Sequence, residues 1–168
     1  MSTIRLSDKA YGVVAGAGAS YVTYPPTAGN VPAVTASDEA QTVTVEAKIA
    51  LPASVVINDT IVGFILPAGH VPVDLFITAD DLDSSTGITL TVAVLDATLA
   101  ALVASTNFIT ASTVAQAGGV ARASVVDGLR LAPAAYDRYI GALVVAAPTG
   151  TQAGTLTIVG SYRASNAD

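Results

Sequence analysis

The sequence contains few side chains that could carry out catalysis. It has one histidine, His70, and no cysteine, whereas a serine or thiol nucleophile needs a base beside it. A lone histidine in the turn Ala68–Val71 is more often a hydrogen-bonding residue than a general base. No Gly-x-Ser-x-Gly motif is present, and Gly16-Ala17-Gly18 lacks the third glycine of a dinucleotide-binding loop. We therefore expect no catalytic residues and no cofactor.

The acidic run Asp80-Asp81-Leu82-Asp83 is the strongest candidate for a cation site, because Ca²⁺ prefers several carboxylate and carbonyl oxygens. The run lacks the glycine at position six and the glutamate at position twelve of an EF-hand loop. We interpret it as a loop in which Asp and Ser side chains bond to their own backbone, with cation binding by Asp80, Asp81 and Asp83 as the alternative. No metal is expected.

A glycoside hydrolase would need two carboxylates across a cleft, about 5–10 Å apart. The candidate acids are scattered along the chain, and their spacing pairs none of them: Glu46, Asp59, Asp74 and Asp96. Asp59, Asp96 and Asp127 each fall at a predicted strand end or turn, which is an ordinary place for aspartate. We therefore predict a protein that is not an enzyme.

Composition excludes further classes. The 168 residues include 7 Lys+Arg and 13 Asp+Glu, for a net charge of -6, which opposes a nucleic-acid binder with its basic footprint. Charged residues are 12% of the chain, against about 25% in typical domains. The two long uncharged stretches, 97–121 and 139–162, contain Asn, Gln, Gly or Pro, which is unlike a membrane-spanning helix. The N-terminus lacks the apolar segment of a secretory signal.

Residues 1–41 are predicted to form an extended N-terminal arm. Pro25, Pro26 and Pro32 oppose a helix there. Amphipathic aromatic residues with little charge around them favour a protein interface, although tyrosines could also stack on sugar. The predicted partner-contact residues are Tyr11, Tyr21, Tyr24, Pro25 and Pro26. The run Tyr21–Tyr24 would suit a strand docked on a partner; a disordered tail is the alternative for the whole arm.

Residues 42–168 show the pattern of an all-β domain. Apolar residues alternate with polar ones over 42–51, 88–94 and 155–163, which is typical of half-buried strands. Further strands are expected at 60–66, 71–78, 124–131 and 139–146, and one short helix at 110–119, capped by Thr110 and ended by Gly118-Gly119. Residues 97–104 fit neither pattern clearly. The number and spacing of strands favour a jelly-roll-like β-sandwich.

The small side chains of this chain favour self-association. Alanine, threonine, glycine and valine bury little apolar area, at about 25 cal/mol per Å², whereas ordering each residue costs about 1.5 kcal/mol. Low charge also leaves apolar surface that tends to associate. We predict a homo-oligomer, with a trimer as the first expectation.

Several segments of the predicted sandwich resemble the capsid decoration, or cement, proteins of tailed bacteriophages. The resemblance covers residues 42–163 and leaves out the arm; residues 97–105 would be an insertion. It is carried by Asn58–Gly69, Val71–Asp74, Asp80–Asp83, Phe108–Gly119, Asp137–Gly141, Ala153–Thr155 and Tyr162-Arg163. These are turns and strand starts, which could also mark another small virion protein.

The resemblance implies a jelly-roll sandwich, trimers on the outer capsid surface, and binding over junctions between subunits of the major capsid protein. It implies no cofactor and no turnover. Such a protein would be made in the bacterial cytoplasm and would end in the virion. The alternatives are a receptor- or carbohydrate-binding jelly-roll module of a phage fibre and, less favoured, a polysaccharide-degrading domain.

Overall fold

A computed structural model describes residues 3–6, 20–22 and 41–165 of the chain. This part of the chain is almost entirely β-structure, with one short α-helix and one 3-10 turn. The elements are β1 Thr3–Leu6, β2 Ser20–Val22, β3 Thr42–Leu51, β4 Thr60–Leu66, β5 His70–Ala79, β6 Thr89–Leu95, β7 Ile109–Ser112, η1 Val114–Gln116, β8 Gly119–Arg122, α1 Val126–Leu129, β9 Arg138–Ala146 and β10 Gly154–Ala164.

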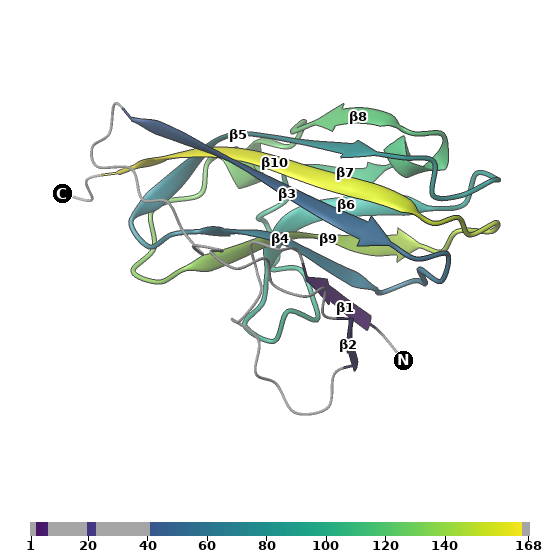
Figure 1. Ribbon diagram of the computed structural model, residues 1–168. Coiled ribbons are helices and arrows are strands. Elements are labelled where there is room, and N and C mark those ends of the chain that lie inside the picture. The colour runs from purple at the N-terminus through teal and green to yellow at the C-terminus, as the bar shows by residue number, and fades with distance from the viewer. Residues whose placement is uncertain (1–2, 7–19, 23–40, 166–168) are drawn as a thin grey trace.

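The strands form two sheets that pack face to face (Figure 1). One has the order β2-β1-β4-β9-β6-β7 and the other the order β3-β10-β5-β8. If β3 to β10 are counted as strands one to eight, the sheets read two-seven-four-five and one-eight-three-six. This alternation between sheets is the double Greek key of a jelly roll, so the predicted all-β sandwich is confirmed.

Strand β3, at one edge of the four-stranded sheet, has an alternating sequence. Ala47, Ile49 and Leu51 are buried, whereas Glu46 and Lys48 between them are exposed, as expected for a strand with one face on the core. Every residue of β4 is buried. Ile61, Phe64 and Leu66 belong to the core between the sheets, and Val62 and Ile65 are buried outside that core. The six-stranded sheet therefore buries apolar side chains on both faces.

The core is built from aliphatic side chains of both sheets, with a few aromatic rings among them. Phe64 of β4 stacks on Tyr162 of β10, with ring centroids 6.4 Å apart. A Cβ atom at Gly160 would collide with the Phe64 ring. A glycine in the middle of a strand normally weakens it, but here it makes room for the Phe64 ring that stacks on Tyr162 between the sheets.

Pro72 lies in β5, the third strand of its sheet. A proline in a strand normally needs an edge, because it has no N–H to donate. β5 pairs with β10 along most of its length but with β8 only from Phe76 to Ala79. Pro72 therefore lies in the half of β5 that has one strand neighbour, next to a register shift at Ser161/Tyr162.

Two expected elements were wrong. The helix predicted for 110–119 is instead β7, the turn η1 and β8, because positive φ at Ala111 interrupts a helix there and Ile109–Ser112 pairs with β6. The strand predicted for 124–131 contains α1, whose Gly128 N–H donates to Asn107 O at 2.8 Å. A side chain at Gly128 would meet the Phe108 ring, so this helical turn packs directly on the core.

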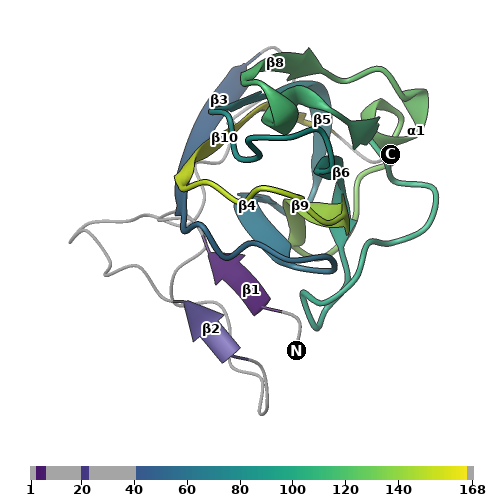
Figure 2. The ribbon, with the colours of Figure 1, turned by 90° about the vertical axis from the view of Figure 1, so that its right-hand side faces the viewer.

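Two short strands from the first forty residues extend the six-stranded sheet. β1 pairs in parallel with β4, and β2 pairs in parallel with β1 (Figure 2). The segment Ser20–Val22 thus pairs with a strand of its own chain. The division of the chain into an arm at 1–41 and a sandwich domain at 42–168 stays a prediction.

Candidate functional site

The predicted contact residues of the arm fall mostly outside the described part of the chain. Four of them lie outside it: Tyr11, Tyr24, Pro25 and Pro26. Tyr21 belongs to β2, opposite Ile4 of β1. Their role in binding a partner therefore stays a prediction.

The carboxylate of Asp83 is fully buried and accepts six hydrogen bonds. Its shortest bonds are from the backbone N–H groups of Gly87 and Gly150, both at 2.7 Å. The donors are Ser85 N and Oγ, Gly87 N, Ile88 N, Thr149 N and Gly150 N. One side chain therefore ties its own loop to a loop 66 residues away.

Hydrogen bonding decides the charge state of Asp83. Burial raises the pKa of its carboxyl, but the backbone N–H groups of Ile88, Gly150, Gly87 and Ser85 together lower this pKa far below its ordinary value. A carboxylate that accepts several N–H bonds stays ionised even when it is buried. Asp83 is thus a structural anion at neutral pH.

The neighbouring acids also bind backbone groups. Asp80 Oδ2 accepts from Thr155 N at 2.7 Å, and Asp81 Oδ1 accepts from Asp83 N at 3.1 Å. Within the described residues, no three His, Cys, Asp or Glu side chains are placed to hold a metal ion. The bonds of Asp80 and Asp81 to backbone N–H groups are those that the loop interpretation expects, and cation binding stays the alternative.

The other acids considered for catalysis have separate local partners. Glu46 pairs with Lys48 at 3.9 Å, and Asp74 pairs with Arg122 at 3.3 Å. Asp59 Oδ2 accepts from the backbone N–H of Val56. Burial raises the pKa of Asp96, but hydrogen bonds from Thr98, Ala100 and Ala101 lower it overall. Asp59 and Asp96 thus bond to their own turns, whereas Glu46 and Asp74 form ion pairs.

His70 is a packed residue of β5. It is 6% exposed, its Nδ1 lies 2.9 Å from Ala68 O, and its ring meets the Tyr162 ring edge-on with centroids 5.6 Å apart. Arg138 donates to the backbone oxygen of His70 from the opposite sheet. The Arg138 side chain thus joins the two sheets through the backbone of His70.

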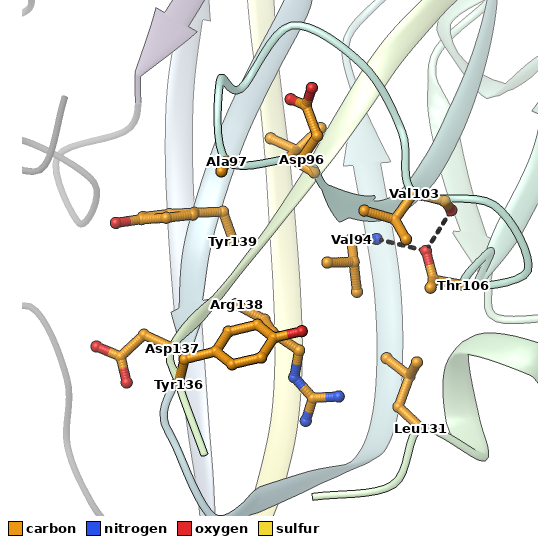
Figure 3. Close-up of a pocket in the computed structure, with 11 residues that line it drawn as sticks. Val94, Asp96, Ala97, Val103, Thr106, Leu131, Tyr136, Asp137, Arg138 and Tyr139 are labelled. Atoms are coloured by element: carbon orange, nitrogen blue, oxygen red, sulfur yellow. Dashed lines mark hydrogen bonds between the residues drawn. The ribbon is translucent and has the colours of Figure 1, made fainter. Parts of the chain in front are cut away.

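A pocket of about 470 Å³ opens where β6 ends and β9 begins (Figure 3). Its lining comes from three separate segments, and most of the exposed lining is apolar. The lining residues are Val94, Leu95, Asp96, Ala97, Val103, Thr106, Leu131, Tyr136, Asp137, Arg138 and Tyr139. Sequence reasoning did not select this site, although Tyr136-Asp137-Arg138-Tyr139 concentrates ring and charge in a chain poor in both.

Arg138 is the buried cation of this pocket. Its side chain is 8% exposed. Nη1 donates to Ala132 O at 2.9 Å and Nη2 to His70 O at 2.8 Å, whereas Nε has no hydrogen-bond partner. Burial lowers the pKa of Arg138, and the neighbouring Tyr136 partly offsets this effect. Burial, together with Asp137, raises the pKa of Tyr139.

Two solved structures share this fold. A chain in the capsid of Ralstonia phage GP4 is 26% identical and superposes with a TM-score of 0.73 over 98% of this chain and 100% of that chain. A chain in the capsid asymmetric unit of cyanophage Pam1 is 25% identical, with a TM-score of 0.60 over 74% of this chain and 85% of that chain.

The chain matches nothing in two further comparisons. No protein-family model and no curated protein matches the chain. No helix in the described ranges has the length and apolar content needed to cross a membrane. The two structural neighbours are parts of phage capsids and share the jelly-roll-like sandwich, which supports a phage capsid-related protein.

Proposed function

We propose that this chain is a structural virion protein that decorates the outer surface of a phage head and stabilises it across junctions between major capsid protein subunits. The observation that carries this proposal is the match to a chain of the Ralstonia phage GP4 capsid, which covers 98% of this chain and all of that one. The same sandwich thus occurs as a component of a phage capsid.

The surface of the chain supports an assembly role. Several large apolar side chains are exposed, including Val56, Ile57 and Tyr136, and charged residues are 12% of the sequence. A specific interface buries roughly 1,600 Å² in total, and the many copies on a capsid add avidity. We propose that the chain forms homotrimers that bind the shell through such surfaces, with the residues 1–41 arm contributing contacts through Tyr11, Tyr21 and Tyr24.

Reconstitution on heads that lack this protein tests the proposal. Purified chain is added to such heads of the same phage, bound copies are counted, and the particles are imaged by electron cryomicroscopy. We expect saturable binding, extra density outside the shell over subunit junctions, and a higher temperature of genome release. Density confined to the tail, or no binding, would overturn the decoration role.

Light scattering tests the oligomeric state separately. We expect a mass three times the 16.7 kDa of one chain. A stable monomer at micromolar concentration would contradict the trimer without touching the capsid assignment.

The fibre-module alternative gains no support from the neighbours, which are both capsid components. The same images would identify it, because a receptor-binding module would lie at the tail tip and would bind glycans without stabilising the head.

A further inference from the structure

The pocket beside Arg138 has the size and lining of a binding site. Its volume of about 470 Å³ falls within the roughly 300–1,000 Å³ typical of ligand pockets. Val94, Val103 and Leu131 supply apolar walls. At its mouth, Val103 is 39% exposed and Tyr136 is 68% exposed. These walls therefore offer apolar surface that an incoming group would remove from water.

Most polar groups of the lining are already engaged. Thr106 Oγ1 accepts from Val94 N and donates to Val103 O. Asp96 accepts bonds from its own loop, and Asp137 Oδ1 accepts from Ala68 N at 2.8 Å. These bonds hold the walls in place, so they would not be exchanged for bonds to a ligand.

Arg138 Nε is different, because it is a buried N–H group without a partner. An arginine nitrogen can only donate, and a buried unpaired donor destabilises the folded state. Arg138 and Tyr136 both line the pocket (Figure 3), and Tyr136 is near enough to influence the pKa of Arg138. The Tyr136 hydroxyl can donate as well. The pocket therefore favours a hydrogen-bond acceptor next to an apolar group.

The charge of the lining decides what kind of acceptor fits. Two acids, Asp96 and Asp137, and one cation, Arg138, line the pocket, and the whole chain carries a net charge of -6. A carboxylate ligand would be attracted by the Arg138 cation, whose Nη1 and Nη2 already donate to backbone oxygens, but it would also face two like charges, which disfavour it. A neutral carbonyl does not meet this repulsion. In a peptide, such a carbonyl stands next to every apolar side chain.

We propose that this pocket binds an apolar side chain of a partner protein, with the adjacent backbone carbonyl accepting from Arg138 Nε and Tyr136. That this partner is the capsid shell rests on the proposed function. Because Nε is buried in the free chain, the exposed Tyr136 ring must move aside for the carbonyl to reach it.

Titration with a neutral peptide fragment tests the pocket on the free protein. N-acetyl-L-leucine methylamide is added to ¹⁵N-labelled chain, and amide chemical shifts are followed. We expect saturable shifts centred on residues 94–106 and 131–139, with a millimolar Kd appropriate to so small a ligand. N-acetyl-L-leucine, which ends in a carboxylate, should bind at least about threefold more weakly because of the two acids. Absent or scattered shifts, or tighter binding of the carboxylate, would overturn the proposal.

A pair of variants connects the pocket to the partner. Val103→Asp places a third acid at the mouth, and Val120→Asp makes the same change at a residue of β8 that is 65% exposed. We expect both to fold with nearly wild-type Tm. Val103→Asp should lose the fragment shifts and bind heads at least about tenfold more weakly, whereas Val120→Asp should change neither by as much as twofold.

The two measurements separate the two proposals. If the fragment binds wild-type chain but Val103→Asp decorates heads normally, the assignment of the pocket to the shell contact is overturned. If the chain binds no heads, the decoration role fails, and the fragment titration still decides whether the pocket takes a neutral peptide group.

Discussion

Each end of the sandwich buries one charged side chain, and the two ends differ in whether that side chain makes all its hydrogen bonds. β6 runs from Thr89, next to the Asp83 loop, to Leu95, which lines the pocket. At the first end, the Asp83 carboxylate accepts six hydrogen bonds. At the second end, Arg138 donates two hydrogen bonds and leaves Nε without a partner.

This difference distinguishes Asp83, which stabilises the fold, from Arg138, which is suited to binding a partner. A buried polar group that makes all its hydrogen bonds favours a single folded structure. A buried polar group that lacks one hydrogen bond lowers the stability of the folded state. The Asp83 end holds two loops together through a buried charge that already accepts six hydrogen bonds. The Arg138 end keeps a donor unpaired beside an exposed aromatic ring, which is the arrangement expected where a partner completes the site.

The largest effect is expected for Asp83→Ala. Six donors would lose their acceptor, and the 83–88 loop would separate from residues 149–150. We expect the melting temperature to fall by on the order of 10 °C, measured by circular dichroism. Asp81→Ala, which removes one acceptor from an exposed residue, should lower it by less than about 2 °C. Equal losses would contradict a special role for Asp83.

The pH dependence of stability should report the same carboxylate. Because hydrogen bonds hold the folded-state pKa of Asp83 well below its ordinary value, its contribution is complete above the unfolded-state pKa of about 3.9 and is lost as pH falls below it. We expect the difference in melting temperature between wild type and Asp83→Asn to be constant from pH 7 to about pH 5 and to shrink below about pH 4. A difference that is unchanged at pH 2 would contradict ionised Asp83 as the cause.

Arg138→Met should have a smaller effect. It removes two hydrogen bonds to His70 O and Ala132 O but also removes a buried cation with an unpaired N–H. These effects partly cancel, so we expect a loss of about 1–2 kcal/mol in the free energy of unfolding, measured by urea denaturation. Arg130→Met, at an exposed position, is the matched control. A loss equal to that of Asp83→Ala would remove the contrast between the two ends.

The smallest change in stability is expected for Tyr136→Ala. The side chain is 68% exposed, so the free energy of unfolding should change by less than about 0.5 kcal/mol. Binding of the neutral leucine fragment and of heads should nevertheless weaken, because the variant loses a wall of the pocket and one donor. Clear destabilisation with unchanged binding would show that Tyr136 serves folding instead.

Periodicity predicted the long strands well, because their pattern is local. The predicted range 42–51 is that of β3, and 88–94 and 155–163 differ from β6 and β10 by one residue at each end. β7 and β8 have four residues each, too few to show alternation. These segments form strands because β7 pairs with β6 and β8 pairs with β5. Pairing with a distant strand cannot be recognised from the sequence of so short a segment.

The sites were less accessible to sequence reasoning. The sequence predicted a loop in which aspartates such as Asp83 bond to nearby backbone groups. It could not predict the bonds of Asp83 to Thr149 and Gly150, which lie 66 and 67 residues away. The pocket was missed because its lining comes from residues 94–97, 103–106 and 131–139, and β-pairing between distant segments brings them together.

The place of β10 in its sheet has a consequence for how this chain acquires its structure during synthesis. β10 lies between β3 and β5, although it follows every other strand of the sandwich in the sequence. Until residues 154–164 leave the ribosome, β3 and β5 cannot be joined, and both present open backbone edges. The four-stranded sheet must therefore close after translation has passed residue 164, in a late and non-local step, and unfinished chains would be prone to aggregate through those edges.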